Sequence, residues 1–375
     1  MARAAAAKPR EATNHVSEWF GHRVFPSVVA DASSLDDQRG QRCPFLSTAK
    51  ASDTPCIKSE ASKGVCTVST SSGRVRQDWL VCPYRALDPA LLNDAVGRLF
   101  GLSPGDQALI LPGIRLVEPA MRTEVADRLD AGGRAFIYFD EKLGGELSIP
   151  GTSRSPEFSF DVTVFEIERQ DGQPHVGRFG IVEIQTMDFH GSYRHAVRNL
   201  REGLRMFGND FPTTLQARQE WLAEHMEGPN IANVFKRTFY QMMFKFQLGQ
   251  HPRCAGCVLA LPVSVWNSWQ PHLGAPTLRP HGDGTHDLLR PGEARPERVP
   301  AWIYAFGLDA AAAQTPSPVV VGTVIATSAA AMSHHALDVA PAAALSNIAS
   351  AGGMLTLARR RLRLFWPQLA DTLTV

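Results

Sequence analysis

Alternating apolar and polar positions predict three strands in the middle of the chain. The segments 134–140, 158–169 and 178–187 are rich in Val, Ile, Phe and Tyr, which favour strands. Apolar residues recur at helical spacing elsewhere, and we expect helices over five segments, 88–100, 116–130, 192–207, 215–227 and 233–246. The Pro-, Gly- and His-rich stretch 271–300 is typical of a surface loop.

The third predicted strand carries two polar residues, Glu183 and Gln185, inside an apolar run. Side chains two positions apart on a strand share a face, so these two point the same way while their apolar neighbours point into a core. An Asp-Gly turn signal joins this strand to the preceding one. With the turn centred on Gly172, Asp161 faces Glu183 directly.

Two facing carboxylates require a cation, because like charges directly opposite each other destabilise a sheet. Their Cβ atoms would lie roughly 5 Å apart, and all-oxygen ligation suits Mg²⁺. Glu146, in "EKLGGELSI", offers a further acid. The alternative is that Asp161 and Glu183 lie without a role on a solvated sheet face, since exposed acids are common. Against it, three large apolar residues share that face: Phe165, Phe179 and Ile181.

Composition places few constraints on partners. The 375 residues are 44% hydrophobic, as in ordinary globular proteins, and the formal net charge is +1. Any attraction to nucleic acid must therefore come from local basic patches. The sequence contains neither a signal peptide nor a membrane-spanning apolar run, so we expect a cytoplasmic protein with reduced cysteines. Residues 1–13 are expected to form a disordered arm.

Four of the six cysteines fall in the segment 31–82, which reads as loop-rich: Cys43, Cys56, Cys66 and Cys82. Their spacing leaves two interpretations open, small buried hydrophobes or a four-sulfur metal site. A loop-rich segment has little apolar material to hold itself together, which favours a metal, and tetrahedral sulfur ligation fits zinc or iron. Cys254 and Cys257 form a C-x₂-C pair far along the chain and are a less favoured alternative.

Two basic patches are candidates for contacting DNA phosphates. The first is an arginine stripe along the segment 192–207, made by Arg194, Arg198, Arg201 and Arg205. The second is the pair Lys236 and Arg237 in the predicted helix 233–246. Charge runs on helices are usually solvated faces, which is the alternative for both. We expect His190 and His195 to be structural.

The chain resembles the PD-(D/E)xK nuclease superfamily, in which an Asp is followed after about twenty residues by acid-x-Lys on paired strands. Here Asp161 and Glu183 match this pattern, and Gln185 replaces the lysine. Longer blocks between about residue 14 and about residue 280 are similar to the NotI-type type II restriction endonucleases. They are "WFGHRVFP", "CPFLSTAK", "DWLVCPYRALDP", "EKLGGELSI", "SPEFSFD", "EIQTMDFHGSY" and "EGPNIANVFKRTFYQM".

The resemblance implies an α/β fold, a PD-(D/E)xK restriction-endonuclease-like mixed sheet flanked by helices, with a small metal-binding N-terminal subdomain. It divides the chain into the arm 1–13, a four-cysteine subdomain 14–105, and a catalytic and DNA-binding domain 106–375. The implied active-site set is Glu146, Asp161, Glu183 and Gln185, with Mg²⁺ on Asp161 and Glu183. The four cysteines would hold one structural iron, with zinc as the alternative.

The implied function is that of a homodimer that cuts double-stranded DNA at a GC-rich palindrome, GCGGCCGC or a GGCC-centred relative, in the bacterial cytoplasm. A cognate DNA methyltransferase is expected as a genetic partner. Gln185 would orient the attacking water, because an amide takes no proton near pH 7, and Lys142 is the alternative source of the missing positive charge. The rival interpretations are a catalytically silent DNA-binding protein and a repair or mobile-element nuclease of the same fold.

Overall fold

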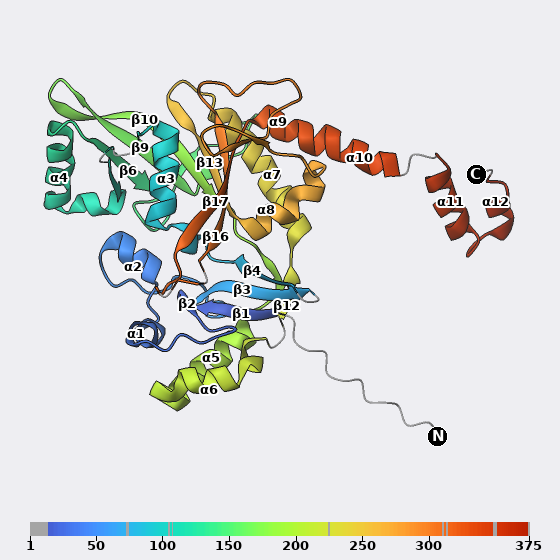
Figure 1. Cartoon of the computed structure of the whole chain (residues 1–375), viewed down its shortest axis with the longest axis horizontal. Coiled ribbons are helices and arrows are strands. Elements are labelled where there is room, and N and C mark those ends of the chain that lie inside the picture. Colours follow the sequence, from blue (N-terminus) through green and yellow to red (C-terminus); the bar gives the residue numbers. More distant parts are fainter. Residues whose placement is uncertain are drawn as a thin grey trace.

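The computed structural model describes residues 14–72, 75–103, 106, 108–223, 226–309, 311–312, 314–347 and 351–373. The predicted arm 1–13 lies outside the described residues. The protein is a mixed α/β structure built on a nine-stranded sheet, with helices on both faces (Figure 1). Within the described part of the chain, no helix is both long and apolar enough to cross a membrane.

The large sheet combines parallel and antiparallel neighbours. At its centre β10 pairs antiparallel with β9 and parallel with β13, and β9 pairs antiparallel with β6. From edge to edge the strands are β14 (Arg279–Pro280), β15 (His286–Asp287), β17 (Val319–Thr327), β16 (Ala301–Leu308), β13 (Cys254–Pro262), β10 (Gln173–Ile184), β9 (Val162–Gln170), β6 (Arg134–Phe139) and β5 (Ala108–Pro112).

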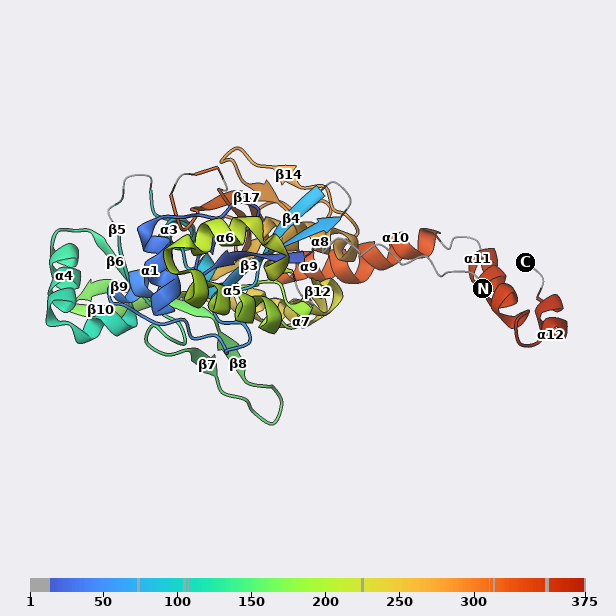
Figure 2. The same cartoon turned by 90° about the horizontal axis from the view of Figure 1, so that it is seen from below.

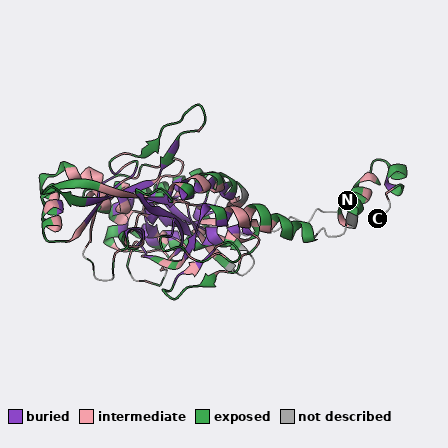
Figure 3. Ribbon diagram, turned by 90° about the horizontal axis from the view of Figure 1, so that it is seen from above, coloured by how far each residue is buried: buried purple, intermediate pink, exposed green. Residues whose placement is uncertain are grey.

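Helices bury both faces of this sheet. On one face, β10 sends Val182 into a core with α3 (Pro89–Phe100) and α2 (Pro44–Lys50). On the other face, Ile181 packs with α7 (Ile231–Leu248), α8 (Val263–Trp269) and α9 (Ala329–His334). Because strands alternate faces, Glu183 points with Ile181 toward α7. Of the central strands, β13 is buried along its whole length, whereas β9 and β10 are buried near the end that carries Glu183 and exposed toward the turn that joins them (Figure 3).

A smaller four-stranded sheet has the order β2-β1-β3-β4. Val16, Val68 and other residues of its inner face pack against Val197 and Phe211, which come from α5 and α6. The domain boundary predicted at residue 105 stays a prediction, although α3 already packs on the large sheet. The elements of this layer are β1 (Asn14–Trp19), β2 (His22–Arg23), β3 (Val65–Ser72), β4 (Val75–Leu80), α1 (Ala32–Gly40), η1 (Pro83–Ala86), α5 (Arg194–Phe207), η3 (Gly208–Asp210) and α6 (Phe211–Ala217).

Most predicted elements form, with one clear exception. The helices predicted over 88–100 and 116–130 correspond to α3 and to α4 (Pro119–Asp130), which follows η2 (Gly113–Val117). The helix predicted over 215–227 is wrong. The chain there divides into the end of α6, η4 (Gln219–Leu222) and β12 (Met226–Pro229), which pairs with β11 (Phe189–Gly191). Leu222 is buried in the core of the small sheet, so packing rather than helical periodicity decides this segment.

Two features extend from the body. The hairpin of β7 (Leu147–Ile149) and β8 (Phe158–Phe160) protrudes on one side (Figure 2). At the C-terminal end, the chain leaves the large sheet through further helical segments that expose several large apolar side chains, including Phe365 and Trp366. These segments are η6 (His335–Val339), α10 (Ala340–Asn347), α11 (Ala351–Leu362) and α12 (Pro367–Asp371). Elsewhere in the chain, η5 (Gln270–Leu273) overlaps the start of the predicted loop 271–300.

Candidate active site

The β9–β10 hairpin has the predicted register near Asp161 and Glu183, but its turn and a bulge in β10 were not predicted. Asp171 and Gly172 both have positive φ, 51° and 74°, and make a two-residue turn in which Gln173 faces Gln170. The turn is therefore centred between these residues and not on Gly172 as predicted. A bulge after Val176 then adds one residue to β10, so that farther along Val182 faces Val162. The predicted register holds at the site because of this bulge.

Asp161 and Glu183 lie side by side at the end of this hairpin. The backbone N–H of Asp161 donates to Glu183 Oε1 at 3.3 Å, and the N–H of Ile184 donates to Asp161 Oδ2 at 2.8 Å. Asp161 occupies the bend between β8 and β9, which turns its side chain toward β10. The two carboxylates expected to face each other are thus neighbours.

Glu183 is buried, with 8% of its surface exposed, because α7 covers its face of the sheet. Burial raises the pKa of its carboxyl to about 8. The negative charge of Asp161 raises this pKa further, and Lys245 partly offsets both effects. A carboxyl with a raised pKa keeps its proton to higher pH than an ordinary carboxyl does.

Lys245 is the functional candidate that the sequence analysis missed. It is buried on α7, its ammonium contacts Glu183 Oε2, and its Nζ lies 5.7 Å from the centroid of the Phe160 ring. A signal for it exists in the sequence. Lys245 follows Met242 by three positions and so lies on the predicted inward, apolar face of this helix.

The amide of Gln185 is held in one orientation. Its Oε1 accepts a hydrogen bond from Thr238 Oγ1, and its Nε2 donates to the carbonyl of Thr186. Its backbone N–H donates to the carbonyl of Ala260 on β13 at 2.9 Å. The side chain expected to position water or a phosphate oxygen is therefore fixed to α7 rather than free in solvent.

These side chains line one small cavity, which we call the acid cavity. Asp161, Glu183, Gln185 and Lys245 all contribute to its wall, and its volume is about 30 Å³, enough for a water molecule or a small ion. Two carboxylates fit Mg²⁺, which commonly takes one or two protein carboxylates and fills its remaining positions with water and phosphate oxygens. Asp161 and Glu183 are thus the side chains of this cavity whose chemistry suits a divalent ion.

Two further acids lie near the acid cavity. In the β7–β8 ladder Leu147 faces Phe160, so the next residues outward, Glu146 and Asp161, come next to each other. Glu146 is exposed. Asp140, at the end of β6, was not predicted. Burial raises its pKa to about 6, and the charges of Asp161 and Glu146 contribute to this rise.

Lys142 lies apart from Glu183. Its backbone N–H donates to Asp140 Oδ1 at 2.8 Å, but its Nζ lies 2.5 Å from Glu141 Oε1 at the surface. The charge that faces Glu183 comes from α7, not from this loop. A catalytic role for Lys142 stays an untested prediction.

The four N-terminal cysteines come together, and we call them the cysteine cluster. Backbone hydrogen bonds from Cys43 to Thr54 and from Cys56 to Gln41, both 2.8 Å, bring the first two together. Cys66 and Cys82 interact through their sulfur atoms on neighbouring segments. Among the described residues, no group of three or more His, Cys, Asp or Glu side chains is already arranged to hold a metal.

The pKa values of these thiols are shifted in different directions. Burial raises the pKa of Cys43 to about 12. The hydrogen bond between their sulfurs raises the pKa of Cys66 and lowers that of Cys82 to about 6. Four sulfur donors fit zinc or iron chemically. Metal binding would require most of these thiols to lose protons.

Cys254 and Cys257 are separate from the cysteine cluster. Both lie at the start of β13 and are fully buried in the core on the α7 face. Burial raises the pKa of both thiols. They pack as small hydrophobes.

The predicted basic patches are exposed. Arg201 pairs with Glu60 at 2.6 Å, and Arg237 pairs with Asp188 at 2.6 Å at the start of α7, next to the exposed Lys236. The opposite side of α5 packs on the small sheet. A shallow groove of about 710 Å³ runs along the basic face of α5, which consists of Arg194, Arg198, Arg201 and Arg205.

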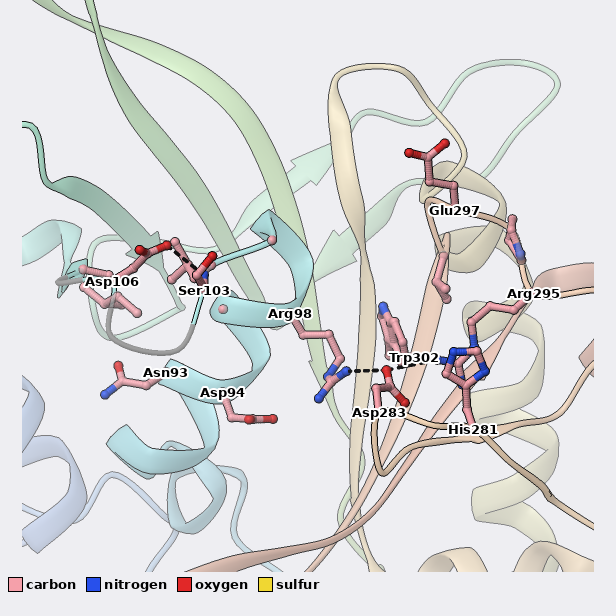
Figure 4. A pocket seen from close by; sticks show the side chains of 17 residues that line it. Asn93, Asp94, Arg98, Ser103, Asp106, His281, Asp283, Arg295, Glu297 and Trp302 are labelled. Carbon is pink, nitrogen blue, oxygen red and sulfur yellow. Dashed lines mark hydrogen bonds and ion pairs between the residues drawn. The ribbon is translucent and has the colours of Figure 1, made fainter.

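A larger cavity, about 910 Å³, lies elsewhere and contains none of the predicted site residues. It lies between α3 and the loop around residues 281–299 (Figure 4). Asp283 there pairs with Arg98 at 3.6 Å and with Arg295 at 3.2 Å, and both guanidinium groups lie over the Trp302 ring. Its central charges are thus satisfied by one another.

Comparison with known proteins adds no family assignment. No protein-family model and no curated protein matches this chain.

Proposed function

We propose that this chain is a Mg²⁺-dependent type II restriction endonuclease of the NotI type, with the PD-(D/E)xK fold. It would act in the bacterial cytoplasm and cut double-stranded DNA at a GC-rich palindrome, GCGGCCGC or a GGCC-centred relative. The observation that carries the proposal is the acid cavity, where Asp161 and Glu183 are neighbours on paired strands. The mixed sheet with helices on both faces agrees with the proposed fold.

Each residue of the acid cavity would have its own role in phosphodiester hydrolysis. Asp161 and Glu183 would hold Mg²⁺, and exposed Glu146 lies where it could bind a water of that ion. When bound, the ion lowers the pKa of water and neutralises charge developing on the phosphate. Gln185 donates and accepts hydrogen bonds but takes no proton, so its role is to orient the attacking water or a phosphate oxygen. Cleavage leaves a 5′-phosphate.

The cysteine cluster has a structural role in this proposal. Cys43, Cys56, Cys66 and Cys82 would hold one iron, or zinc as the alternative, and would join α2, β3 and the segment before η1. These elements contain few large apolar side chains of their own, and a metal would stiffen the layer that helps to grip DNA.

Contacts to DNA come from the two basic patches. The four exposed arginines on α5 follow β10 and β11 directly along the chain and would neutralise phosphates near the scissile bond. Lys236 and Arg237, near the start of the helix that carries Lys245, would also neutralise DNA phosphates. A symmetric homodimer places one acid cavity on each strand of a palindrome. A cognate methyltransferase would protect the host DNA.

The test is incubation of the purified chain with long duplex DNA and Mg²⁺, followed by sequencing of the product ends. Discrete fragments ending at one GC-rich palindrome support the proposal, provided that Asp161→Asn produces none. Smears or nicks indicate a nuclease of another kind, and an inert protein that still binds DNA indicates a catalytically silent module. Gln185→Ala is expected to cripple turnover, and near wild-type cleavage would move the positioning role elsewhere.

A further inference from the structure

We propose that Lys245 supplies the positive charge that the strand motif of this chain lacks. The inference rests on the proposed nuclease function and deepens it. In the acid-x-Lys pattern the lysine stands two residues after the acid on the same strand. That position here is Gln185, so the strand brings no cation to the acid cavity.

The ammonium of Lys245 reaches Glu183 from the opposite side. It contacts Glu183 Oε2, while Glu183 Oε1 accepts the N–H of Asp161 at 3.3 Å. Glu183 is therefore held at both oxygens, once by a neutral donor and once by a charged donor. Both side chains of the ion pair are nearly buried, with 5% of the Lys245 side chain and 11% of the Glu183 side chain exposed. Solvent screening is weak at such burial, which makes the pairing of charges decisive.

Helical spacing explains why α7 can take over this task. Thr238 and Lys245 are seven residues apart, which is about two turns, so they lie on the same face. Thr238 holds the Gln185 amide, and Lys245 holds the Glu183 carboxylate. The helix thus fixes the two polar side chains of β10 and adds a cation to the same cavity.

The cations near the acid cavity leave no equivalent candidate. Among the described residues that line the cavity, Lys245 is the only cation. Lys142 pairs with Glu141 at the surface, and Arg237 pairs with Asp188. Lys245 would balance the repulsion between Asp161 and Glu183 in the metal-free protein. Beside a bound phosphate, it would balance the negative charge that increases in the transition state.

The experiment exchanges the two residues. Lys245→Gln is expected to lower the single-turnover rate of cleavage with Mg²⁺ by about 100-fold or more. Gln185→Lys combined with Lys245→Gln returns an ammonium to the same cavity and is expected to recover at least about 10-fold of this loss. Lys50→Gln, which removes a partly exposed lysine on α2 that does not line the acid cavity, is the control and should cleave at the wild-type rate.

A second readout is independent of cleavage. In metal-free buffer, Lys245→Gln leaves the two carboxylates without a buried cation. Its melting temperature is expected to fall by about 5 °C, and the exchanged variant should regain part of this fall. A residue that only packs α7 onto the sheet would not be replaced by a lysine from β10.

The outcomes separate the inference from the proposed function. Wild-type cleavage by Lys245→Gln overturns the inference and leaves the nuclease intact. Loss of cleavage in both Lys245→Gln and a folded Lys245→Arg also overturns it, because Lys245→Arg keeps the charge and leaves the Gln185 amide in place. If neither variant folds, Lys245→Arg decides, because it keeps the charge. Cleavage within about tenfold of wild type then supports the inference, and a folded, inactive Lys245→Arg contradicts it. A wild-type chain that cuts no DNA defeats the proposed function itself.

Discussion

The acid cavity brings together two carboxylates that repel each other, and the cysteine cluster brings together buried thiols. The two sites differ in how a nearby lysine balances their negative charge. In the acid cavity, the ammonium of Lys245 contacts Glu183 directly. Near the cysteine cluster, Lys58 influences Cys66 and Cys82 electrostatically, but its Nζ donates to the carbonyls of Val65 and Val81 at 2.7 and 3.0 Å.

This difference in charge balance indicates which of the two sites can fold without a metal. The acid cavity contains a cation of its own, so its two carboxylates can be buried before any ion arrives. The cysteine cluster can carry one thiolate, on Cys82, because the Cys66 thiol lowers its pKa, but it cannot hold several thiolates unless a metal neutralises them. We therefore expect metal at the acid cavity to govern activity, and metal at the cysteine cluster to govern stability.

The largest expected effect is on catalysis at the acid cavity. Asp161→Asn and Glu183→Gln should each lower the rate of DNA cleavage by about 1,000-fold or more, because each removes one of the two proposed ligands for Mg²⁺. Asp161→Asn should remain folded, since it removes a negative charge beside Glu183. Glu183→Gln leaves the buried ammonium of Lys245 without its acidic partner, so its fold is verified by circular dichroism before its rate is compared. Glu168→Gln, at an exposed acid on β9, is the matched control. Cleavage by either cavity variant at the wild-type rate would contradict the assigned roles.

The next effect concerns the cysteine cluster. Cys66→Ser should release one tightly bound metal ion per chain, measured by elemental analysis, and lower the melting temperature by about 5 °C or more. Cys254→Ser should keep the metal, because Cys254 is buried away from the cluster. Full metal content in Cys66→Ser would remove the four-cysteine assignment.

A smaller effect is the pH dependence of stability in metal-free protein. The folded-state pKa of Glu183, about 8, exceeds the ordinary value near 4.5, so the folded state binds the extra proton between these values. The free energy of unfolding should therefore fall as pH rises from 5 to 8, by at most about 1.4 kcal/mol per pH unit.

Chemical denaturation across this pH range measures the slope. Glu183→Gln should flatten the profile because glutamine does not titrate. A profile of unchanged slope in that variant would show that Glu183 keeps an ordinary pKa in the folded protein.

The smallest expected effect is on DNA affinity. Arg198→Ala on α5 should weaken binding a few-fold on every sequence and reduce the salt slope by about 1, as expected for one lost phosphate contact. Arg290→Ala, at an exposed arginine near the large cavity, should leave both unchanged. A change confined to one DNA sequence would instead indicate that Arg198 contacts a base.

Local patterns predict the strands and the meeting of the two acids. The alternation around Glu183 and the Asp-Gly turn act over a few residues, and burial of one sheet face protects the register. The bulge after Val176 was not predicted, since an extra residue in a strand leaves the apolar pattern ambiguous. The N-terminal strand β3 was missed because Ser and Thr dominate its sequence and resemble a loop. The neighbouring β4 was missed because Arg, Gln and Asp make up half of its six residues.

Long-range contacts explain what the sequence could not show. Lys245 meets Glu183 across 62 residues, and this contact depends on how α7 is rotated on the sheet. Its position on an apolar helix face was a signal, but many lysines in such places extend to solvent. Asp140 became a candidate only when the pairing of β6 with β9 placed its strand end near Asp161.

The most direct test of the central claim is a crystal structure of the chain bound to duplex DNA with Mn²⁺ in place of Mg²⁺. We expect an anomalous peak between the carboxylates of Asp161 and Glu183, within about 2.5 Å of an oxygen of each. Anomalous peaks at the cysteine cluster alone, or a Mn²⁺ ion that contacts neither carboxylate, would contradict that claim.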